Sequence, residues 1–319
     1  MKAAVRSKYG TGDVLSIQEI AIPSPKDNEV LIRVYATTAN RSDYHVLTGK
    51  PFFMKLFTGL FKPKQAVIGT DFAGQVEAIG ENVRSFNAGD KVMGFSGAFS
   101  CGSHAQYLAF PENKGIVMMP HNLNYEQAAA CLEGTFYATG VVLGLKPTMG
   151  QKALVYGATG AIGSAYVQVL KYFGVYIAAV CGGENAELVR SLGADKIIDY
   201  KTEDFTKDTE RYDYVFDAIG KSSFMKCKRL LKKKGMYLPS GGAENIFLIP
   251  ITRLLGGKKV GFTGSGNIKG TLEFIKGLVE KGNYKPVIDR TYPLEKIGEA
   301  FDYVATGQKI GNVVIVMDS

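Results

Sequence analysis

The clearest pattern of apolar and polar positions along the chain lies within residues 152–174. The apolar run 153–156 predicts a buried strand, and apolar residues recur at helical spacing from Ile162 to Phe173. Three glycines separate the two patterns at G-x-x-G-x-x-G spacing: Gly157, Gly160 and Gly163. We therefore expect a strand, a tight glycine turn and a helix in direct succession, with Gly174 ending the helix.

A strand that leads into a helix within a few residues needs backbone angles that glycine adopts at low cost. Bare backbone at such a turn lets a pyrophosphate approach, and the free N–H groups and the dipole at the helix start favour an anion. A second apolar run at 175–180 completes a strand–helix–strand unit. This context favours dinucleotide binding over the alternative, a tight turn that holds no ligand.

Strand and helix patterns alternate after residue 124, which predicts a parallel sheet. Further strands are expected at 196–199, 214–217, 235–238 and 260–263, with helices at 184–192 and 222–231. Before about residue 120, short apolar runs are broken by Gly, Pro, Asn and Asp, which predicts a β-rich region. Its strands are expected at 30–35, 74–79 and 91–95. The tail from about residue 271 predicts one helix and a last strand at 313–317, packed back on the N-terminal domain.

Composition changes this picture little. The 319 residues are 46% hydrophobic and 21% charged, as in an ordinary globular protein. The formal net charge of +8 would suit an anionic cofactor, a nucleic acid or a membrane surface, yet the basic residues are scattered. The one tight run, Lys232-Lys233-Lys234, is interpreted as the solvated end of a helix before Gly235. No nucleic-acid-binding motif is present, so we expect no nucleic-acid partner.

The four cysteines, Cys101, Cys131, Cys181 and Cys227, form no C-x-x-C pair and are too few for a disulfide scaffold. Free thiols in a reducing compartment are therefore expected. Residues 1–12 lack the apolar core of a signal peptide, and no stretch approaches the ~18 apolar residues of a membrane span. These features predict a cytoplasmic protein.

A family resemblance is carried by these stretches: VLIRVYATTANRSDYHVLTG, IGTDFAGQVEAIGENVRSFNAGDKVMGF, GSHAQYLAFP, YGATGAIGSAYVQVLKYFG, SLGADKIIDYKTEDF, YDYVFDAIG and QKIGNVVIV. Together they resemble the medium-chain dehydrogenase/reductase superfamily over nearly the whole chain, and most closely its zinc-free quinone oxidoreductase branch. The resemblance implies an α/β fold with a Rossmann doubly wound parallel sheet in residues 124–270. It also implies a β-rich GroES-like catalytic domain in residues 1–123 and 271–319, and a homodimer.

The resemblance also bears on metal binding. Zinc alcohol dehydrogenases carry Cys where this chain has Asn40, a His-Glu pair where it has Thr70-Asp71, and a third ligand at the position of Cys131. One thiol and one carboxylate do not complete the three or four ligands that zinc requires. The four-cysteine structural zinc lobe is absent as well. We therefore expect no bound metal, with Cys131 as a small apolar filler near the pocket.

The end of the second Rossmann strand bears on cofactor choice. NAD sites usually place an Asp or Glu there, whereas NADP sites avoid that charge. Here Cys181, Gly182 and Gly183 leave room for a phosphate. Asn185 is a candidate to bind it with help from Arg190, although NADPH-binding relatives often have Lys at the position of Asn185.

Two neighbouring residues complete this end of the predicted site. Tyr200 matches a family position that stacks or hydrogen-bonds at the adenosine end. Glu184 either caps the next helix or is the displaced ribose-binding acid of an NAD site. We expect NADPH as the cofactor, with NADH less favoured.

Further cofactor contacts are expected in the glycine turn and at the carboxyl ends of the strands. The candidates are Thr159, Ala161 and Ile162 in the turn, Ala218, Ile219 and Gly220 after one strand, Ser240 and Gly241 after the next, then Gly264, Ser265 and Asn267, and Thr135, which matches a cofactor-facing Thr in the family. For each of them a role in a plain turn is the alternative.

Without a metal or a nucleophile motif, the protein would position a hydride donor against an acceptor. Asn40 and Asp43 match the family's Asn-x-x-Asp at the floor of the pocket. We expect Asn40 to hydrogen-bond near the nicotinamide or the substrate carbonyl, and Asp43 to hold the loop. Tyr44 and His45 are candidate proton donors to a quinone or enolate oxygen, with packed or surface side chains as the alternative. The other two histidines are interpreted as ordinary loop residues.

These features predict a zinc-independent, NADPH-dependent reductase that passes hydride to a quinone or an α,β-unsaturated carbonyl, a small-molecule substrate. Two alternatives remain open. One is a nicotinamide-dependent alcohol dehydrogenase, which would need a catalytic acid or metal not found here. The other is a non-catalytic protein that binds NADPH or associates with a membrane.

The segment 50–64, KPFFMKLFTGLFKPK, is unusual. Its apolar residues Phe53, Phe57, Leu60 and Phe61 recur at roughly helical spacing with lysines between them. Its place in the chain predicts a lid or wall over the substrate site, which would suit a bulky apolar acceptor. A basic amphipathic helix also binds membrane surfaces, which is the alternative for this segment.

Overall fold

The computed structural model describes residues 1–97, 100–241, 243–262, 264 and 266–317, without the side chains of residues 243, 244 and 246. The chain forms two compact units, one of Met1–Phe136 with Asn267–Ser319 and one of Tyr137–Gly266. We refer to them as the first and second units.

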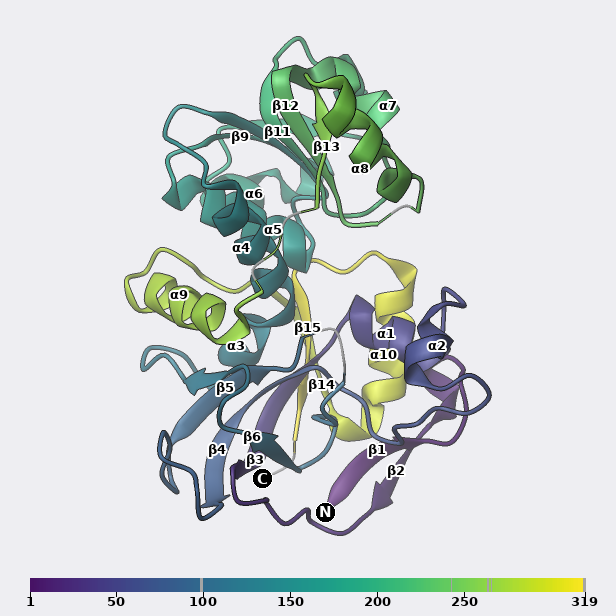
Figure 1. Ribbon diagram of the computed structural model, residues 1–319, viewed down its shortest axis with the longest axis vertical. Helices are drawn as coiled ribbons and strands as arrows, with labels where there is room; N and C mark the ends of the chain where they lie inside the picture. The colour runs from purple at the N-terminus through teal and green to yellow at the C-terminus, as the bar shows by residue number, and fades with distance from the viewer. Residues whose placement is uncertain (98–99, 242, 263, 265, 318–319) are drawn as a thin grey trace. The chain divides into compact units, whose positions relative to one another are not determined.

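The second unit is built on a parallel sheet with the strand order β10-β9-β8-β11-β12-β13 (Figure 1). Its strands are β8 Lys152–Tyr156, β9 Tyr176–Cys181, β10 Lys196–Asp199, β11 Tyr212–Asp217, β12 Leu231–Pro239 and β13 Lys259–Val260. The order runs outward from β8 in one direction and from β11 in the other, so the topological switch point lies between these two strands. The expected doubly wound α/β sheet is confirmed.

The helices of this unit follow the strand–helix alternation. They are α4 Glu133–Leu145, which starts in the first unit, then α5 Ala161–Tyr172, α6 Ala186–Ser191, α7 Phe224–Cys227 and α8 Ala243–Leu255. Of the predicted last strand at 260–263, Val260 lies in β13, Gly261 and Phe262 lie outside a strand, and Thr263 lies outside the described residues. Helix α8 was not predicted.

The interpretation of Lys232-Lys233-Lys234 as a helix end is wrong. Helix α7 stops at Cys227, and the three lysines lie in β12 with exposed side chains. The pairing of β11 with β12 shifts register here: Tyr212 pairs with Leu231, but Tyr214 pairs with Met236. The lysines lie in this irregular stretch of the strand, where their charges stay in water.

The first unit contains a mostly antiparallel sheet with the order β14-β15-β3-β4-β5-β7, and β6 also pairs with β3. Its strands are β3 Glu29–Ala39, β4 Asp71–Ile79, β5 Lys91–Phe95, β6 Tyr107–Pro111, β7 Ile116–Met118, β14 Ile288–Pro293 and β15 Asn312–Val316, and β1 Lys2–Arg6 pairs separately with β2 Leu15–Glu19. The three strands that the N-terminal pattern predicts lie within β3, β4 and β5.

The helices of the first unit come from both ends of the chain. They are α1 Arg41–Thr48, α2 Met54–Thr58, α3 Tyr125–Ala130, α9 Ile268–Glu280 and α10 Ile297–Thr306. Helix α3 packs on β3, β4 and β15, and the boundary between the two compact units falls inside α4, after Phe136. The helical pattern expected across residues 53–61 is confined to α2, since Gly59 ends the helix with φ +121°.

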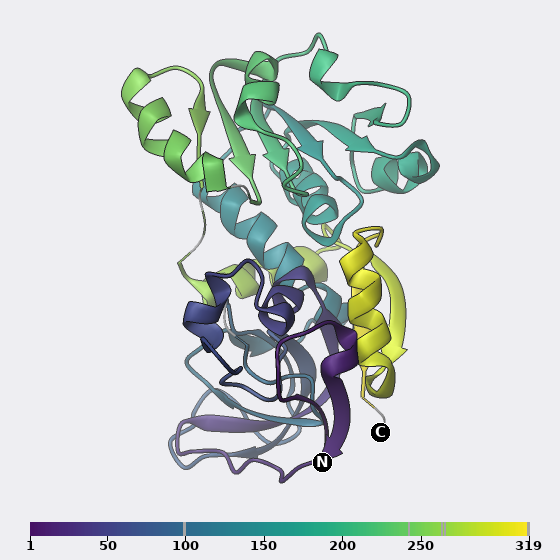
Figure 2. The ribbon, with the colours of Figure 1, turned by 90° about the vertical axis from the view of Figure 1, so that its right-hand side faces the viewer.

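The C-terminal tail joins the first unit through its last strand. β15 pairs antiparallel with β3, with Val313 opposite Ala39. The expectation of a single helix in the tail is wrong, because α10 follows α9. Figure 2 shows α10, in yellow, alongside the C-terminal strands that it contacts. Its buried side chains share one face: Ile297, Ala300, Phe301 and Val304.

Candidate functional site

The glycine turn of the second unit is shaped by two close approaches of the backbone. Gly157 has φ +84°, and a Cβ there would lie 2.2 Å from the side chain of Ile219. A Cβ on Gly163 would lie 2.0 Å from the carbonyl oxygen of Gly157. Both positions therefore require glycine if α5 is to start directly behind β8.

Gly160, between them, is different. It is the N-cap of α5 with an ordinary φ of −71°, and the nearest atom to a Cβ there would be 3.7 Å away. The N–H groups of the first helical turn, which includes Ala161 and Ile162, have no partner within a helix. Thr159 precedes this turn. Open space in front of free amides at a helix start is the arrangement that binds a phosphate.

Asp217 fixes the loop that faces this turn. It is the last residue of β11 and is buried, and its carboxylate accepts hydrogen bonds from the amides of Ile219 at 3.1 Å, Gly220 at 2.7 Å and Ser222 at 2.8 Å. The hydroxyl of Tyr237 donates a fourth at 2.9 Å. Sequence reasoning missed this role of Asp217, whose only sign is an acid at the end of an apolar strand.

The predicted contacts after β11 and β12 gather around the glycine turn. The amide of Ala218 donates to the carbonyl of Tyr156 at 3.0 Å, and Ile219 lies over Gly157. The amide of Ser240 donates to the carbonyl of Asp217 at 2.9 Å. With Gly220 and Gly241 beside them, these residues line the carboxyl edge of the sheet at the switch point, where nucleotides bind in open α/β sheets.

Other predicted cofactor residues lie elsewhere. Gly264 is exposed in the second unit, and Ser265 lies outside the described residues. Asn267 belongs to the first unit, where its side chain caps α9 by accepting from the amide of Gly270 at 2.9 Å. The hydroxyl of Thr135 is buried and hydrogen-bonds Tyr284 at 2.6 Å.

The predicted adenosine end forms where β9 and β10 finish side by side. The amide of Tyr200 donates to the carbonyl of Cys181 at 3.2 Å. Burial raises the pKa of the Cys181 thiol to about 11, so this side chain stays neutral. Gly182 follows directly, and Asn185 leads into α6 without a side-chain cap bond.

The Glu184 side chain does not cap α6, and its carboxylate is not free of an ionic partner. Its carboxylate forms an ion pair with Lys201 at 2.8 Å, and this bond holds the pKa of Glu184 below its usual range. Lys201 therefore brings a cation to the place where a family lysine at position 185 is missing. Sequence reasoning did not identify it.

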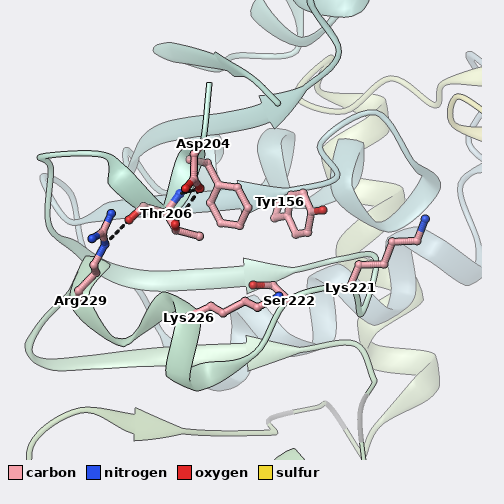
Figure 3. Close-up of a pocket in the computed structure, with 8 residues that line it drawn as sticks. Tyr156, Asp204, Thr206, Lys221, Ser222, Lys226 and Arg229 are labelled. Carbon is pink, nitrogen blue, oxygen red and sulfur yellow. Dashed lines mark hydrogen bonds between the residues drawn. The ribbon is translucent and has the colours of Figure 1, made fainter. Parts of the chain in front are cut away.

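A hollow of about 470 Å³ opens on the second unit near the ends of β8 and β11 (Figure 3). It is lined by Tyr156, Asp204, Phe205, Thr206, Lys221, Ser222, Lys226 and Arg229. The Tyr156 and Phe205 rings stack with centroids 4.7 Å apart. The carboxylate of Asp204 accepts from the Thr206 hydroxyl at 2.7 Å, while three side chains in the hollow are cationic. This charge balance favours an anionic ligand.

In the first unit, Asn40 is held by its neighbours. As the N-cap of α1, its side-chain oxygen accepts from the amide of Asp43 at 2.8 Å. Its amide group donates to the hydroxyls of Thr38 at 3.2 Å and Thr70 at 3.1 Å. Both N–H donors are thus used within the protein, and an acceptor position on the oxygen remains.

Asp43, whose amide donates to the Asn40 side chain, is completely buried. Its Oδ2 is 3.4 Å from the Thr70 hydroxyl and 3.8 Å from Nε2 of His104, and its Oδ1 has no hydrogen-bond partner in the described part of the chain. Burial, with Asp71 and Glu133 nearby, raises the pKa of Asp43 well above its ordinary value. Burial and the neighbouring acids thus both disfavour the charged form of this carboxyl group.

The expectation that His104 is an ordinary loop residue is wrong. It is fully buried, with Nε2 3.1 Å from the carbonyl oxygen of Thr38, and burial lowers its pKa to about 4. His121, in contrast, is an exposed loop residue with an 80% exposed side chain.

The candidate proton donors Tyr44 and His45 lie on α1. Tyr44 packs partly against the core, and Arg41 lies over its ring. Burial also lowers the pKa of His45, which keeps its ring neutral.

Two family models match the chain: "Alcohol dehydrogenase GroES-like domain" at residues 26–121 and "Zinc-binding dehydrogenase" at residues 192–315. The chain is 32% identical over 326 residues to the NADPH-dependent alkenal/one oxidoreductase, chloroplastic, of Arabidopsis thaliana, an alignment that covers 99% of this chain and 79% of that relative. It is 31% identical over 329 residues to the quinone-oxidoreductase QR1, chloroplastic, of Triphysaria versicolor, covering 99% and 98%.

A solved structure is similar over its whole length. The quinone oxidoreductase from Coxiella burnetii matches with a TM-score of 0.88 and 25% identity, covering 100% of this chain and 99% of that one. The chain belongs to the medium-chain dehydrogenase/reductase superfamily. Within this superfamily it falls in the quinone oxidoreductase branch, as the resemblance implies.

Two of the positions that match zinc ligands in zinc alcohol dehydrogenases hold side chains that are buried within the first unit. Asp71 is buried, and it accepts hydrogen bonds from the Thr38 amide at 2.8 Å and the Thr38 hydroxyl at 2.6 Å. Cys131 is buried at the end of α3, where burial raises the pKa of its thiol. Among the described residues, no group of three or more His, Cys, Asp or Glu side chains is arranged to hold a metal ion.

One more buried acid lies in the first unit. Glu133 accepts a hydrogen bond from the hydroxyl of Ser42 at 2.6 Å, and burial raises its pKa. Sequence reasoning did not identify this residue. The four cysteines are free thiols. Within the part of the chain that the structure describes, no helix is both long and apolar enough to cross a bilayer.

Proposed function

We propose that this protein is an NADPH-dependent reductase that transfers hydride to a quinone or an α,β-unsaturated carbonyl, without a metal ion. The observation that carries the proposal is the open start of α5 behind Gly157 and Gly163. It occurs in a chain of which 99% aligns with enzymes named as NADPH-dependent alkenal/one oxidoreductase and quinone oxidoreductase. The alternatives of an alcohol dehydrogenase and of a non-catalytic NADPH-binding protein are not favoured by these names.

The second unit fits a dinucleotide. A Cβ on Gly160 would meet only the carbonyl oxygen of Gly157, at an ordinary contact distance of 3.7 Å, so the bare backbone at the start of α5 leaves room for a pyrophosphate. The amides of the first helical turn would hold this group, and the loop fixed by Asp217 would support the adjacent part of the molecule. When bound, NADPH supplies the hydride, and the protein supplies orientation and electrostatics.

NADPH is favoured over NADH by the charges at the end of β9. The acid that would pair with a ribose hydroxyl, Glu184, is paired with Lys201 instead. Lys201 is a cation that a 2′-phosphate would attract, and Asn185 and Tyr200 lie in the same region of the chain. Replacing Lys201 by Ala is expected to raise the Kd for NADPH while leaving that for NADH within about twofold. Equal changes in both constants would contradict this preference.

The first unit supplies the acceptor side of the proposal. Asn40 keeps an acceptor position on its side-chain oxygen, and burial raises the pKa of the Asp43 carboxyl group. Tyr44 and His45 remain the candidate proton donors to the oxygen of the reduced acceptor. The hydrogen bonds on Asp71 and the burial of Cys131 support a mechanism without zinc. A cytoplasmic location remains part of the proposal.

The test is NADPH oxidation by the purified, chelator-treated protein with an ortho-quinone as the acceptor. The proposal expects turnover that added zinc does not increase. Activity that appears only after zinc is restored would contradict the metal-free mechanism. Bound NADPH that is not consumed with quinones, enones or aldehydes would favour the non-catalytic alternative.

A further inference from the structure

Residues 50–64 present an exposed apolar surface on the first unit. Six of its large apolar side chains are at least 46% exposed: Phe52, Phe53, Leu56, Phe57, Leu60 and Phe61. Phe61, at the tip of the segment, is 91% exposed. A contiguous group of exposed apolar side chains marks a contact surface, whereas single exposed residues are ordinary.

Contacts with Tyr9 and with the core of the first unit hold this segment in a defined shape. The hydroxyl of Tyr9 donates to the carbonyl of Gly59 at 2.6 Å and lies 2.8 Å from the hydroxyl of Thr58. Met54 packs against the core of the first unit, and Lys55 lies over the Tyr9 ring at 5.0 Å. The exposed side chains are therefore displayed on an anchored support and need little ordering on contact.

A second hydrogen bond closes the tip. The amide of Lys64 donates to the carbonyl of Thr58 at 2.8 Å, and a Cβ on Gly59 would lie 2.0 Å from the carbonyl oxygen of Lys62. Leu60 and Phe61 thus sit at the end of a tight loop that starts and finishes at one place. A loop of this kind carries its apolar side chains to the outermost part of the segment.

The charges around this surface have one sign. No Asp or Glu occurs between Asp43 and Asp71, and the segment contains four lysines: Lys50, Lys55, Lys62 and Lys64. Within the described residues, none of these lysines has an acidic partner. Exposed aromatic and leucine side chains interleaved with unpaired lysines complement a surface that is negatively charged outside and apolar beneath.

We propose that residues 50–64 dock the first unit onto an anionic lipid bilayer. Phe61 and its apolar neighbours would enter the boundary between headgroups and acyl chains, while the lysines contact the anionic headgroups. Docking of this kind needs no membrane-spanning helix. The proposal is independent of NADPH and of catalysis, so vesicle binding tests it separately from the proposed function.

The chain contains no tryptophan, which permits a site-specific optical test on the full-length protein. In the Phe61→Trp variant, addition of vesicles with 30% phosphatidylglycerol in phosphatidylcholine, roughly the anionic range that gives a strong surface potential, is expected to shift the emission to shorter wavelength. Pure phosphatidylcholine vesicles are expected to cause little shift. The control is Met149→Trp, which places the probe at another highly exposed apolar side chain, just before β8.

Vesicle sedimentation with matched variants tests the two forces separately. The Lys62→Gln/Lys64→Gln variant is expected to lower the vesicle partition coefficient roughly tenfold to thirtyfold, whereas Lys233→Gln/Lys234→Gln removes the same charge elsewhere and changes it little. Phe61→Ser is expected to weaken partitioning roughly tenfold, with Met149→Ser, at another exposed apolar side chain, as its control. These side chains are exposed, so the variants should keep the unfolding temperature of the parent protein.

Several results would overturn the proposal. They are the absence of an emission shift and of co-sedimentation, equal binding to neutral and anionic vesicles, or equal losses in the test and control variants. The proposal would also be overturned if Phe61→Ser left vesicle binding intact but changed the ratio of the KM values for large and small acceptors. That result would indicate that the segment is a lid over the substrate site.

Discussion

Gly160 and Gly163 stand three residues apart in one turn, yet the structure gives them different tasks. Gly163 is required by the protein itself, because a Cβ would lie 2.0 Å from a backbone oxygen. At position 160, no contact among the described residues requires glycine, because a Cβ would fit there. If it is there to admit a pyrophosphate, its replacement should affect the ligand and spare the fold.

We therefore expect Gly160→Ala to raise the Kd for NADPH roughly tenfold or more with little change in unfolding temperature. The control, Gly163→Ala, should instead lower the free energy of unfolding by about 1–3 kcal/mol, because the new methyl group overpacks the turn. Fluorescence titration of NADPH and thermal unfolding measure the two effects. An unchanged Kd in Gly160→Ala would mean that this space does not receive the cofactor.

Asp71 carries a pH-dependent contribution to stability. Burial raises its pKa to about 7, so the folded protein keeps a proton that the unfolded chain releases near pH 4. The stabilisation is fully present below about pH 4 and is lost as the pH rises through 7, to a limit on the order of 4 kcal/mol. Asp71→Asn keeps the acceptor for the Thr38 amide and removes the titration.

The urea midpoint of the parent protein should therefore fall more steeply between about pH 4 and 7 than that of Asp71→Asn. Asp71→Asn also removes the charge that helps to raise the pKa of Asp43, so the comparison reports Asp71 together with its coupling to Asp43, while Glu133 remains in both proteins. Parallel curves for the two proteins would show that Asp71 does not retain its proton in the fold.

The residues that sequence reasoning found and missed differ in one physical respect. The glycine turn is predictable because its spacing and its backbone needs are local. His104 was missed because its burial depends on Thr38, a residue far away in the chain. Asp217 and Lys201 were missed for the same reason, since their partners, Tyr237 and Glu184, lie on other strands or loops.

At the scale of elements, α1 depends on a cap that is also a candidate site residue. Asn40 accepts from the amide of Asp43 and donates to Thr38 and Thr70. Asn40→Ala should lower the free energy of unfolding by about 1 kcal/mol for the lost cap, and by more for the two buried hydroxyls that lose a donor. Asn40→Asp keeps the cap and is the control. Urea denaturation of both variants measures the difference, and equal stability of Asn40→Ala and the parent would contradict this account.

Helices and strands were predicted correctly where apolar residues recurred with a regular period. The predictions were wrong where tertiary contacts determined the local structure. The strands β3, β4, β5 and β10 follow their apolar runs closely. Lys232-Lys233-Lys234 looked like a helix end because charge is common there, but the register shift between β11 and β12 places the lysines in a strand. Helix α10 was overlooked although its apolar face has helical spacing.

At the scale of the whole molecule, the expected homodimer has a candidate surface. Helix α8 exposes Phe247, Ile251, Leu254 and Leu255, and it contacts β13, the last strand of the parallel sheet. Sedimentation velocity should show a dimer that Leu254→Glu/Leu255→Glu converts to a monomer, because two charges would be buried at the contact. Phe61→Ser is the control. A monomeric parent protein would contradict the expectation.

The central claim is that the chain transfers hydride from NADPH to a conjugated acceptor. The most direct test is a single turnover of chelator-treated protein with NADPH deuterated at C4 of the nicotinamide and an α,β-unsaturated ketone. The account predicts NADP⁺ and a saturated ketone with one deuterium at the β-carbon, from one of the two C4-deuterated epimers. Consumption of NADPH without deuterium in the product, or reduction at the carbonyl carbon to an alcohol, would contradict it.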